Sequence, residues 1–256
     1  MLMRDRLNQP WLHAKTVEPV EIARFAVLAE EWWNPNGKFG PIHRFNPVRR
    51  DYIFDRIAGH FYRGRNHDAA LTGLRILDVG CRAGLLCKPL AERGADIVGI
   101  DATARNIEIA HWHAAQSSLD IDYRHCLAEH VLDAGETFDV VLNTEVVEHV
   151  NNPEQLMKEC SALVKPGGAM IVATINRTLR SFMLAIIGAE YVLKWLPKGT
   201  HDWRRFLRPD EVRCMVEAHD LVLNELMGIS FNPFTRSWRL SGDTSVNYML
   251  LAVKRA

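Results

Sequence analysis

The sequence predicts an α/β protein with a mostly parallel sheet, because short apolar strand patterns alternate with amphipathic helix patterns after residue 74. Residues 75–79 form the first strand pattern, and residues 85–93 form the helix pattern that follows. Between them lies the turn Asp-Val-Gly-Cys-Arg-Ala-Gly, residues 78–84. Glycines at such a turn let the backbone approach a ligand, and the helix N-terminus offers unpaired N–H groups. We therefore expect a nucleotide cofactor here.

The remaining elements follow in the same alternating order. Further strands are expected at 96–100, 121–124, 138–143, 169–174, 221–226 and 246–253, with helices at 105–117, 152–163 and 209–219. Together they predict a seven-stranded sheet with helices on both faces. Residues 1–70 have helical patterns at 21–33 and 47–61, and we expect them to form a helical cap. The main domain is expected to span 71–256, with an inserted helix after the fifth strand, at about 177–207.

A carboxylate follows the second strand. Asp101 comes 21 residues after Gly80, where Rossmann-like folds hold an acid that hydrogen-bonds ribose hydroxyls. The alternative is a simple cap of the strand end. A dinucleotide fingerprint starting at Gly80 would need glycines where Arg82 and Leu85 stand, so NAD is disfavoured.

The turn resembles the acid-x-Gly-x-Gly-x-Gly motif of class I S-adenosylmethionine (SAM) methyltransferases. It matches at Asp78, Gly80 and Gly84, and Arg82 breaks it. The resemblance implies a Rossmann-like class I fold with SAM as the cofactor. Arg82 also leaves open a non-catalytic member that serves as a lipid-binding or scaffolding partner. In a catalytic member, we expect Arg82→Gly to tighten SAM binding.

Composition excludes some classes of function. Lys+Arg and Asp+Glu are both 31, so the net charge of zero provides no general attraction to nucleic acid. The five cysteines form no C-x-x-C pair, and the odd count fits reduced thiols. No apolar run is long enough to span a bilayer, and the N-terminus has no signal core. A cytoplasmic protein is expected.

Several longer blocks resemble the ubiquinone-biosynthesis O-methyltransferase family. They lie at residues 32–33, 41–49, 145–150, 164–168, 176–177, 188–191, 197–202, 232–233 and 246–249. The blocks at 188–191 and 197–202 are not shared by methyltransferases at large. The resemblance runs from about residue 21 to the C-terminus.

The family resemblance implies methylation of hydroxyls on polyprenyl phenols and catechols. It places SAM contacts at Arg49, Gly80, Asp101 and Thr144. It also implies peripheral association with the inner membrane and membership of a ubiquinone-biosynthesis complex. A methyltransferase of another small phenol would share every cofactor feature.

The turn after the fourth strand, Glu145-Val-Val-Glu148-His149, is the candidate catalytic site. If no metal is bound there, His149 is the first candidate base for a phenol hydroxyl. Glu145, Glu148 and His149 could also bind Mg²⁺ or another divalent cation. The alternative is that Glu148 and His149 only cap the next helix; resemblance to metal-dependent eukaryotic members favours a metal.

Three further segments leave two interpretations each. Residues 181–196 are strongly apolar but contain Glu190 and Lys194, which suits an interfacial helix in contact with lipid, or a buried lid over the substrate. Trp32 and Trp33 could be core aromatics or a wall for a quinone-like ring. Residues 201–202, His-Asp, could be a second acid/base pair or a solvated loop.

Overall fold

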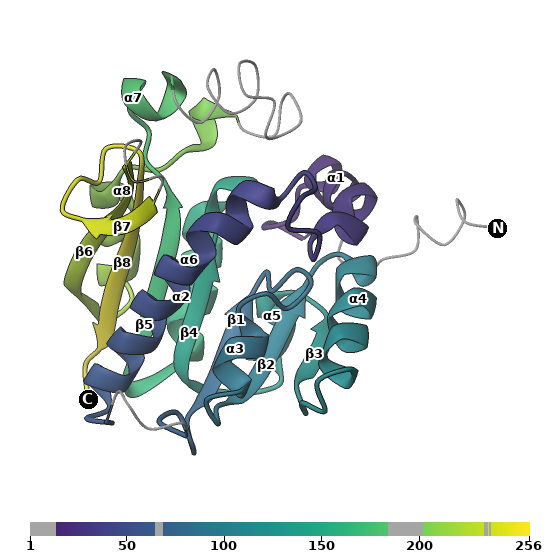
Figure 1. The fold of residues 1–256 in the computed structure, drawn as a ribbon. Coiled ribbons are helices and arrows are strands. Elements are labelled where there is room, and N and C mark those ends of the chain that lie inside the picture. The colour runs from purple at the N-terminus through teal and green to yellow at the C-terminus, as the bar shows by residue number, and fades with distance from the viewer. Residues whose placement is uncertain (1–13, 65–68, 184–201, 233–234, 236) are drawn as a thin grey trace.

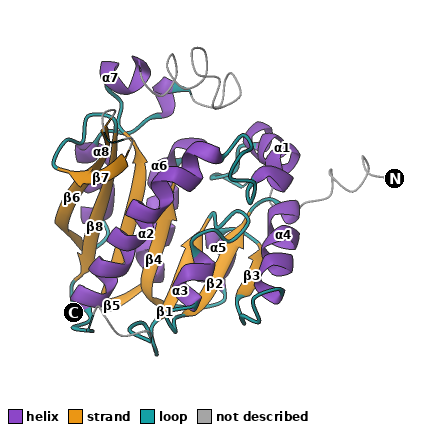
Figure 2. Ribbon diagram, viewed as in Figure 1, coloured by secondary structure: helices purple, strands orange, loops and turns teal. Residues whose placement is uncertain are grey.

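The computed structural model describes residues 14–64, 69–183, 202–232, 235 and 237–256. Within these residues one sheet of eight strands has the order β3-β2-β1-β4-β5-β8-β6-β7 (Figures 1 and 2). The first five strands in this order are parallel, and β8, β6 and β7 pair antiparallel. The predicted Rossmann-like class of fold is confirmed.

The strands are β1 (Arg75–Val79), β2 (Asp96–Asp101), β3 (Asp122–His125), β4 (Phe138–Thr144), β5 (Val164–Ile175), β6 (Leu221–Asn232), β7 (Ser237–Ser241) and β8 (Asn247–Lys254). The α-helices are α1 (Pro19–Leu28), α2 (Gly40–His60), α3 (Cys87–Ala91), α4 (Ala104–Ala115), α5 (Ala128–Asp133), α6 (Pro153–Leu163), α7 (Leu179–Ser181) and α8 (Pro209–Glu217). Short 3₁₀ helices are η2 (Ala29–Glu31), η3 (Val147–His149) and η5 (Trp203–Arg205).

Helices cover both faces of the sheet, as the sequence predicts. On one face α2, α3 and α4 pack into an apolar core that includes Ile53, Leu90 and Ala110. On the other face α5, α6 and α8 form the second core, with Met157 and Val212 fully buried. The central strands are largely apolar because most of their residues are buried on both sides of the sheet. The predicted boundary at residue 70 stays a prediction.

The structure departs from the expected elements at several points. The described sheet has eight strands because β6 continues to Asn232 and pairs with β7, whose residues 237–241 the sequence interpretation missed. The helix α5 was also missed. The sequence Lys-Pro-Gly-Gly at residues 165–168 predicts a turn, but these residues lie within β5, where the β4–β5 register shifts. α2 begins at Gly40 instead of residue 47 and carries Pro47 in its interior.

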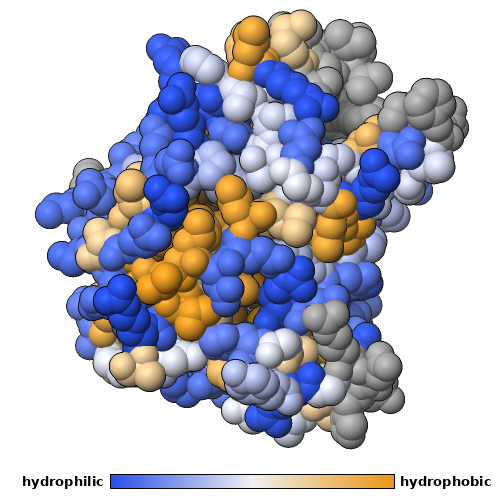
Figure 3. All heavy atoms as spheres, turned by 90° about the vertical axis from the view of Figure 1, so that its left-hand side faces the viewer, coloured by the Kyte–Doolittle hydropathy of each residue, from blue (hydrophilic) through white to orange (hydrophobic). Residues whose placement is uncertain are grey.

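The β6–β7 end of the molecule exposes apolar side chains. Figure 3 shows a hydrophobic area on this side, and Val222, Phe231 and Leu240 are the large apolar residues exposed on these two strands. At the opposite edge of the sheet, β3 is short and polar. None of the described helices is long and apolar enough to cross a membrane.

Candidate active site

The turn after β1 is shaped by glycine. Gly80 and Gly84 have φ values of +72° and +81°, which side-chain-bearing residues rarely adopt. A Cβ at Gly80 would collide with the Val146 side chain, and one at Gly84 would collide with the Tyr123 hydroxyl. The turn after β1 therefore packs directly against the turn after β4, so residues from both strands meet at one place.

The acid of the motif, Asp78, has a structural contact. It is buried, and its Oδ2 accepts a hydrogen bond from the Cys87 thiol at 3.2 Å, while Oδ1 has no hydrogen-bond partner among the residues that the structure describes. Burial raises the pKa of Asp78 to about 6. Asp78 thus connects β1 to α3 beneath the turn.

Asp101 is the last residue of β2, and its carboxylate accepts three hydrogen bonds. Its Oδ2 accepts the Arg82 backbone N–H at 2.9 Å, and its Oδ1 accepts the Thr103 N–H at 2.8 Å and the Asn106 amide at 3.1 Å. A carboxylate offers about four acceptor positions. Asp101 therefore organises the turns after β1 and β2 and keeps capacity for about one hydroxyl of a ligand.

Arg82 occupies the motif position where the sequence departs from glycine. Its φ is +54°, so the backbone there does adopt the left-handed conformation. Its guanidinium donates to the Glu145 carbonyl and lies over the rings of Trp32 and Phe25, at 4.8 and 5.6 Å from their centroids. The side chain thus connects the turn after β1 to the turn after β4 and to the N-terminal segment.

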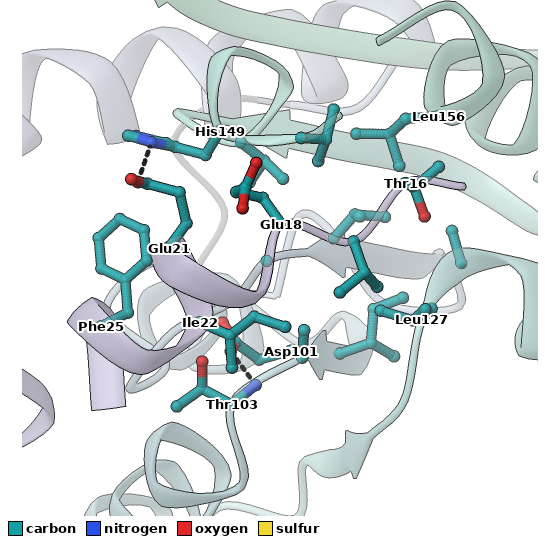
Figure 4. Close-up of a pocket in the computed structure, with 18 of the residues that line it drawn as sticks. Thr16, Glu18, Glu21, Ile22, Phe25, Asp101, Thr103, Leu127, His149 and Leu156 are labelled. Carbon is teal, nitrogen blue, oxygen red and sulfur yellow. Dashed lines mark hydrogen bonds and ion pairs between the residues drawn. The ribbon is translucent and has the colours of Figure 1, made fainter. Parts of the chain in front are cut away.

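A single pocket gathers these elements (Figure 4). It encloses about 740 Å³ of open space, a volume that includes its mouth. Its walls come from residues 16–25, from the ends of β1, β2 and β4, and from the segment between β3 and α5; the lining includes Glu18, Glu21, Ile22, Phe25, Gly80, Arg82, Asp101, Thr103, Cys126, Leu127, Glu145 and His149. This is the carboxyl edge of the parallel strands, where open α/β sheets bind ligands.

The predicted SAM residues fall into two groups. Gly80 and Asp101 line the pocket, whereas Arg49 and Thr144 are buried and do not line it. Arg49 donates to Glu145 Oε1 at 3.3 Å and to Asn46. Burial lowers the pKa of Arg49, and the Glu145 carboxylate opposes that shift. The role of Arg49 and Thr144 in SAM binding stays a prediction.

The predicted metal ligands share one turn but make separate contacts. The Glu145 carboxylate pairs with Arg49, and His149 Nδ1 faces Glu21 Oε2 at 2.8 Å. Glu148 is 2% exposed, and among the described residues no ion pair reaches its carboxyl group. Burial, reinforced by the Glu145 charge, raises the pKa of Glu148 to about 8, which favours the neutral acid. Within the described residues, no three His, Cys, Asp or Glu side chains are arranged to hold a metal ion.

His149 lines the pocket through a turn with defined ends. The Glu145 N–H donates to the Ala173 carbonyl, and Asn152 caps α6 through the Gln155 N–H. Between these points η3 carries His149, whose ring meets the Phe25 ring edge-on at 5.1 Å. The candidate base is therefore held between β4 and α1.

The other two-way interpretations are resolved in part. Trp32 is fully buried, stacks on Phe39 and donates to Asn106, and Trp33 donates to the Ala83 carbonyl. Neither lines the pocket. Asp202 caps η5 through the Arg204 N–H. His201 and residues 184–196 of the predicted interfacial helix lie outside the described residues.

Sequence reasoning missed part of the pocket wall. Residues 126–128 follow β3 and could have been found by the same carboxyl-edge rule that found Asp101. Glu18 and Glu21 come from the first turn of α1 and its N-cap, and no motif marks them.

The fold and the pocket define a class I SAM-dependent methyltransferase. Residues 50–225 match a protein-family model described as a methyltransferase domain. Magnesium protoporphyrin IX methyltransferase from Synechocystis, solved with bound S-adenosylhomocysteine, superposes with a TM-score of 0.60 at 16% identity, covering 98% of this chain and 99% of that one. A SAM-dependent methyltransferase from Clostridium acetobutylicum gives a TM-score of 0.59 at 11% identity, covering 91% and 99% of the two chains.

More similar relatives define the family. The ubiquinone biosynthesis O-methyltransferase of Brucella ovis is 54% identical over 241 residues, covering 94% of this chain and 97% of that protein. The protein of the same name from Chelativorans sp. is 51% identical over 96% of this chain and 97% of its own length. The chain belongs to the ubiquinone biosynthesis O-methyltransferase family.

Proposed function

We propose that this protein transfers a methyl group from SAM to a hydroxyl of a polyprenyl phenol or catechol in ubiquinone biosynthesis. The observation that carries the proposal is one pocket containing the glycine turn, Asp101 and His149. Family membership supports the reaction and the substrate class, since the relatives are named for this step.

The pocket has features that suit SAM. At Gly80 the backbone passes so close to Val146 that only glycine fits, so backbone without a side chain lines the pocket there. Asp101 can accept a ribose hydroxyl, and apolar residues 126–128 offer a wall for a flat ring. When bound, SAM would supply an electrophilic methyl group on its sulfonium sulfur.

His149 is the residue that we assign to proton removal. A phenol has a pKa near ~10, so at neutral pH a base must take the hydroxyl proton or the anion must be stabilised. His149 lies in the pocket wall beside Glu145 and Val146. It would accept the substrate proton, while the pocket holds the hydroxyl oxygen in line with the methyl group.

The metal predicted from the sequence has no place in this proposal. Glu145 and His149 are each paired with another side chain, and burial favours the neutral form of Glu148. A Mg²⁺ ion needs converging, ionised oxygen ligands. These residues do not fit the ion as they lie, so we assign no step to a divalent cation.

We extend the proposal to the membrane, where a polyprenyl substrate resides. Leu179, which lies two residues before the apolar segment, is 74% exposed, and Met183 within the segment is 50% exposed; Arg180 lies between them. Apolar side chains beside cations are typical of interfacial segments. Replacing Phe182, Ile186 and Trp195 by polar residues should release the protein from anionic liposomes without lowering its Tm. A lower Tm with unchanged liposome binding would favour a lid or core helix instead.

Association with a ubiquinone-biosynthesis complex stays a prediction from the resemblance.

The function is tested by calorimetric titration with SAM and by methyl transfer to phenols with long and short prenyl chains. Saturable SAM binding and transfer that depends on the prenyl chain are expected. Equal rates on unprenylated phenols would favour a different small substrate. Absence of SAM binding to the folded protein would refute the assignment.

A further inference from the structure

The N-terminal segment places a carboxylate on the candidate base. Glu21 lies in the first turn of α1, which begins after the N-cap Glu18 and has Pro19 at its first position. Its Oε2 lies 2.8 Å from His149 Nδ1, across 128 residues of sequence. Figure 4 shows Glu21 extending from α1 toward the His149 ring. Both side chains line the pocket and are about 15% exposed.

Neighbouring groups hold this pair in place. Arg24 binds the other Glu21 oxygen at 2.9 Å, and the Phe25 ring packs edge-on against the His149 ring. Burial alone would raise the pKa of Glu21, but the His149 hydrogen bond and the charges of Arg24 and Arg205 outweigh it and hold that pKa below its usual value. Glu21 therefore stays ionised at neutral pH.

A carboxylate facing Nδ1 has a defined effect on imidazole. It fixes the tautomer that carries hydrogen on Nδ1, which leaves Nε2 as the nitrogen able to accept a proton. It also stabilises the imidazolium that forms when a proton arrives. A carboxylate of similar exposure elsewhere in the pocket, Glu18, pairs with Arg205 instead, so the arrangement at His149 is specific to Glu21.

We propose that Glu21 is the positioning residue for His149 in methyl transfer. This inference rests on the proposed function. The phenol proton moves to His149 Nε2, the hydroxyl oxygen keeps the electron pair of its O–H bond, and the Glu21 carboxylate remains ionised throughout. The proton leaves later from the imidazolium to solvent. Among the described residues, the other charged groups near the pair include Glu18, Arg24, Arg205, Glu145 and Glu148.

The test compares Glu21→Gln, His149→Gln and the double variant. Gln keeps the size of Glu21 and a hydrogen-bond acceptor but removes the charge. We expect kcat to fall roughly tenfold or more in Glu21→Gln and roughly a hundredfold in His149→Gln, with SAM affinity within about twofold of wild type. The double variant should be no slower than His149→Gln, because residues that act as a unit are not additive.

A matched control separates positioning from anchoring of the segment. Glu30→Gln removes an ion pair that joins the same segment to Arg105 of α4, outside the pocket, at 2.8 Å. It should keep the kcat and the pH profile of wild type. If Glu21 only anchored the segment, Glu21→Gln would instead weaken SAM binding, and its effect would multiply with that of His149→Gln. That result would overturn the proposal.

An NMR measurement that needs no substrate tests the Glu21–His149 pairing independently of methyl-transfer activity. The ring protons of His149, assigned by their loss in His149→Gln, are followed by NMR over pH 4–9. In Glu21→Gln the ring should take up its proton at a lower pH than in wild type, and the acidic limb of the kcat profile, where protonated His149 cannot act as a base, should move to lower pH with it. An unchanged titration would refute the pairing. Absence of methyl transfer by wild type would instead refute the proposed function, while the NMR result still tests the pair.

Discussion

Asp101→Ala tests whether one carboxylate both organises the site and binds the cofactor. The substitution removes three hydrogen bonds and leaves the N–H groups of Arg82 and Thr103 without their acceptor. Hydrogen bonds to a charged group contribute up to about 3 kcal/mol, but burial of the carboxylate opposes them and raises its pKa. At about 1 kcal/mol net for each bond, the free energy of unfolding should fall by about 3 kcal/mol.

The same change should weaken SAM binding. Since three of about four acceptor positions are already used, one ribose hydroxyl loses its partner, and a charge-assisted bond of about 1.5 kcal/mol corresponds to roughly tenfold in affinity. The Tm should fall by about 6–12 °C, because 1 kcal/mol shifts a chain of this size by about 2–4 °C. Calorimetric titration well below the lower Tm separates affinity from unfolding.

A control at the other end of the same strand isolates the site. Asp96 is exposed and forms an ion pair with Arg75, with Nε–Oδ2 at 3.6 Å, so Asp96→Ala should change stability by less than about 0.5 kcal/mol. Unchanged SAM affinity in folded Asp101→Ala would remove Asp101 from the cofactor site. An unchanged Tm would refute the reasoning about its three hydrogen bonds.

Three further predictions concern the two turns. Arg82→Gly relieves a positive φ that costs about 1–2 kcal/mol but loses the hydrogen bond to Glu145 and the contacts with two aromatic rings, so we expect a slightly lower Tm. We also expect SAM binding to tighten by about tenfold. Equal or weaker SAM binding would show that Arg82 is useful. Glu148 has a raised pKa, so the stability of the wild type should fall as pH rises from about 4.5 through 8. In Glu148→Gln the Tm should depend less on pH over this range, and an equal pH dependence of Tm in the two proteins would contradict the prediction. Turnover should persist in buffer stripped of divalent ions, and a loss restored by Mg²⁺ would reinstate the ligand set of Glu145, Glu148 and His149.

The sequence predicts the central sheet well because its signals are local. Strands buried on both faces are short, largely apolar segments, which makes them recognisable from the local sequence. β7 was missed because it has only five residues, and its strand conformation depends on pairing with the far end of β6. Its alternation of Trp238 and Leu240 with polar residues was the one available signal. α5 is only six residues long, too short for a periodic pattern.

The site is predictable only where topology fixes it. Gly80 and Asp101 follow adjacent parallel strands, so their meeting at one edge follows from the strand order. Arg49 illustrates the limit: sequence resemblance suggests a ligand contact, but only the packing of α2 shows that Glu145 already occupies its guanidinium. Glu21 illustrates the same limit, since no local pattern reports which face of α1 meets a turn 128 residues away.

The departure at Arg82 is best understood together with the N-terminal segment. The common methyltransferase domain begins near residue 50, whereas Phe25 and Trp32, which lie against the Arg82 guanidinium, precede it. Glycine at position 82 would leave space between the turn and these rings, and Arg82 fills that space while donating to the Glu145 carbonyl. The same segment supplies Glu21 to His149. Residues in contact couple energetically, but Phe25 also packs against His149 and Trp32 also stacks on Phe39. These contacts should hold α1 in place in Arg82→Gly, so we expect the variant to change SAM binding without changing His149. A shift of the His149 NMR titration in Arg82→Gly would show instead that the turn and the base are coupled through this wall.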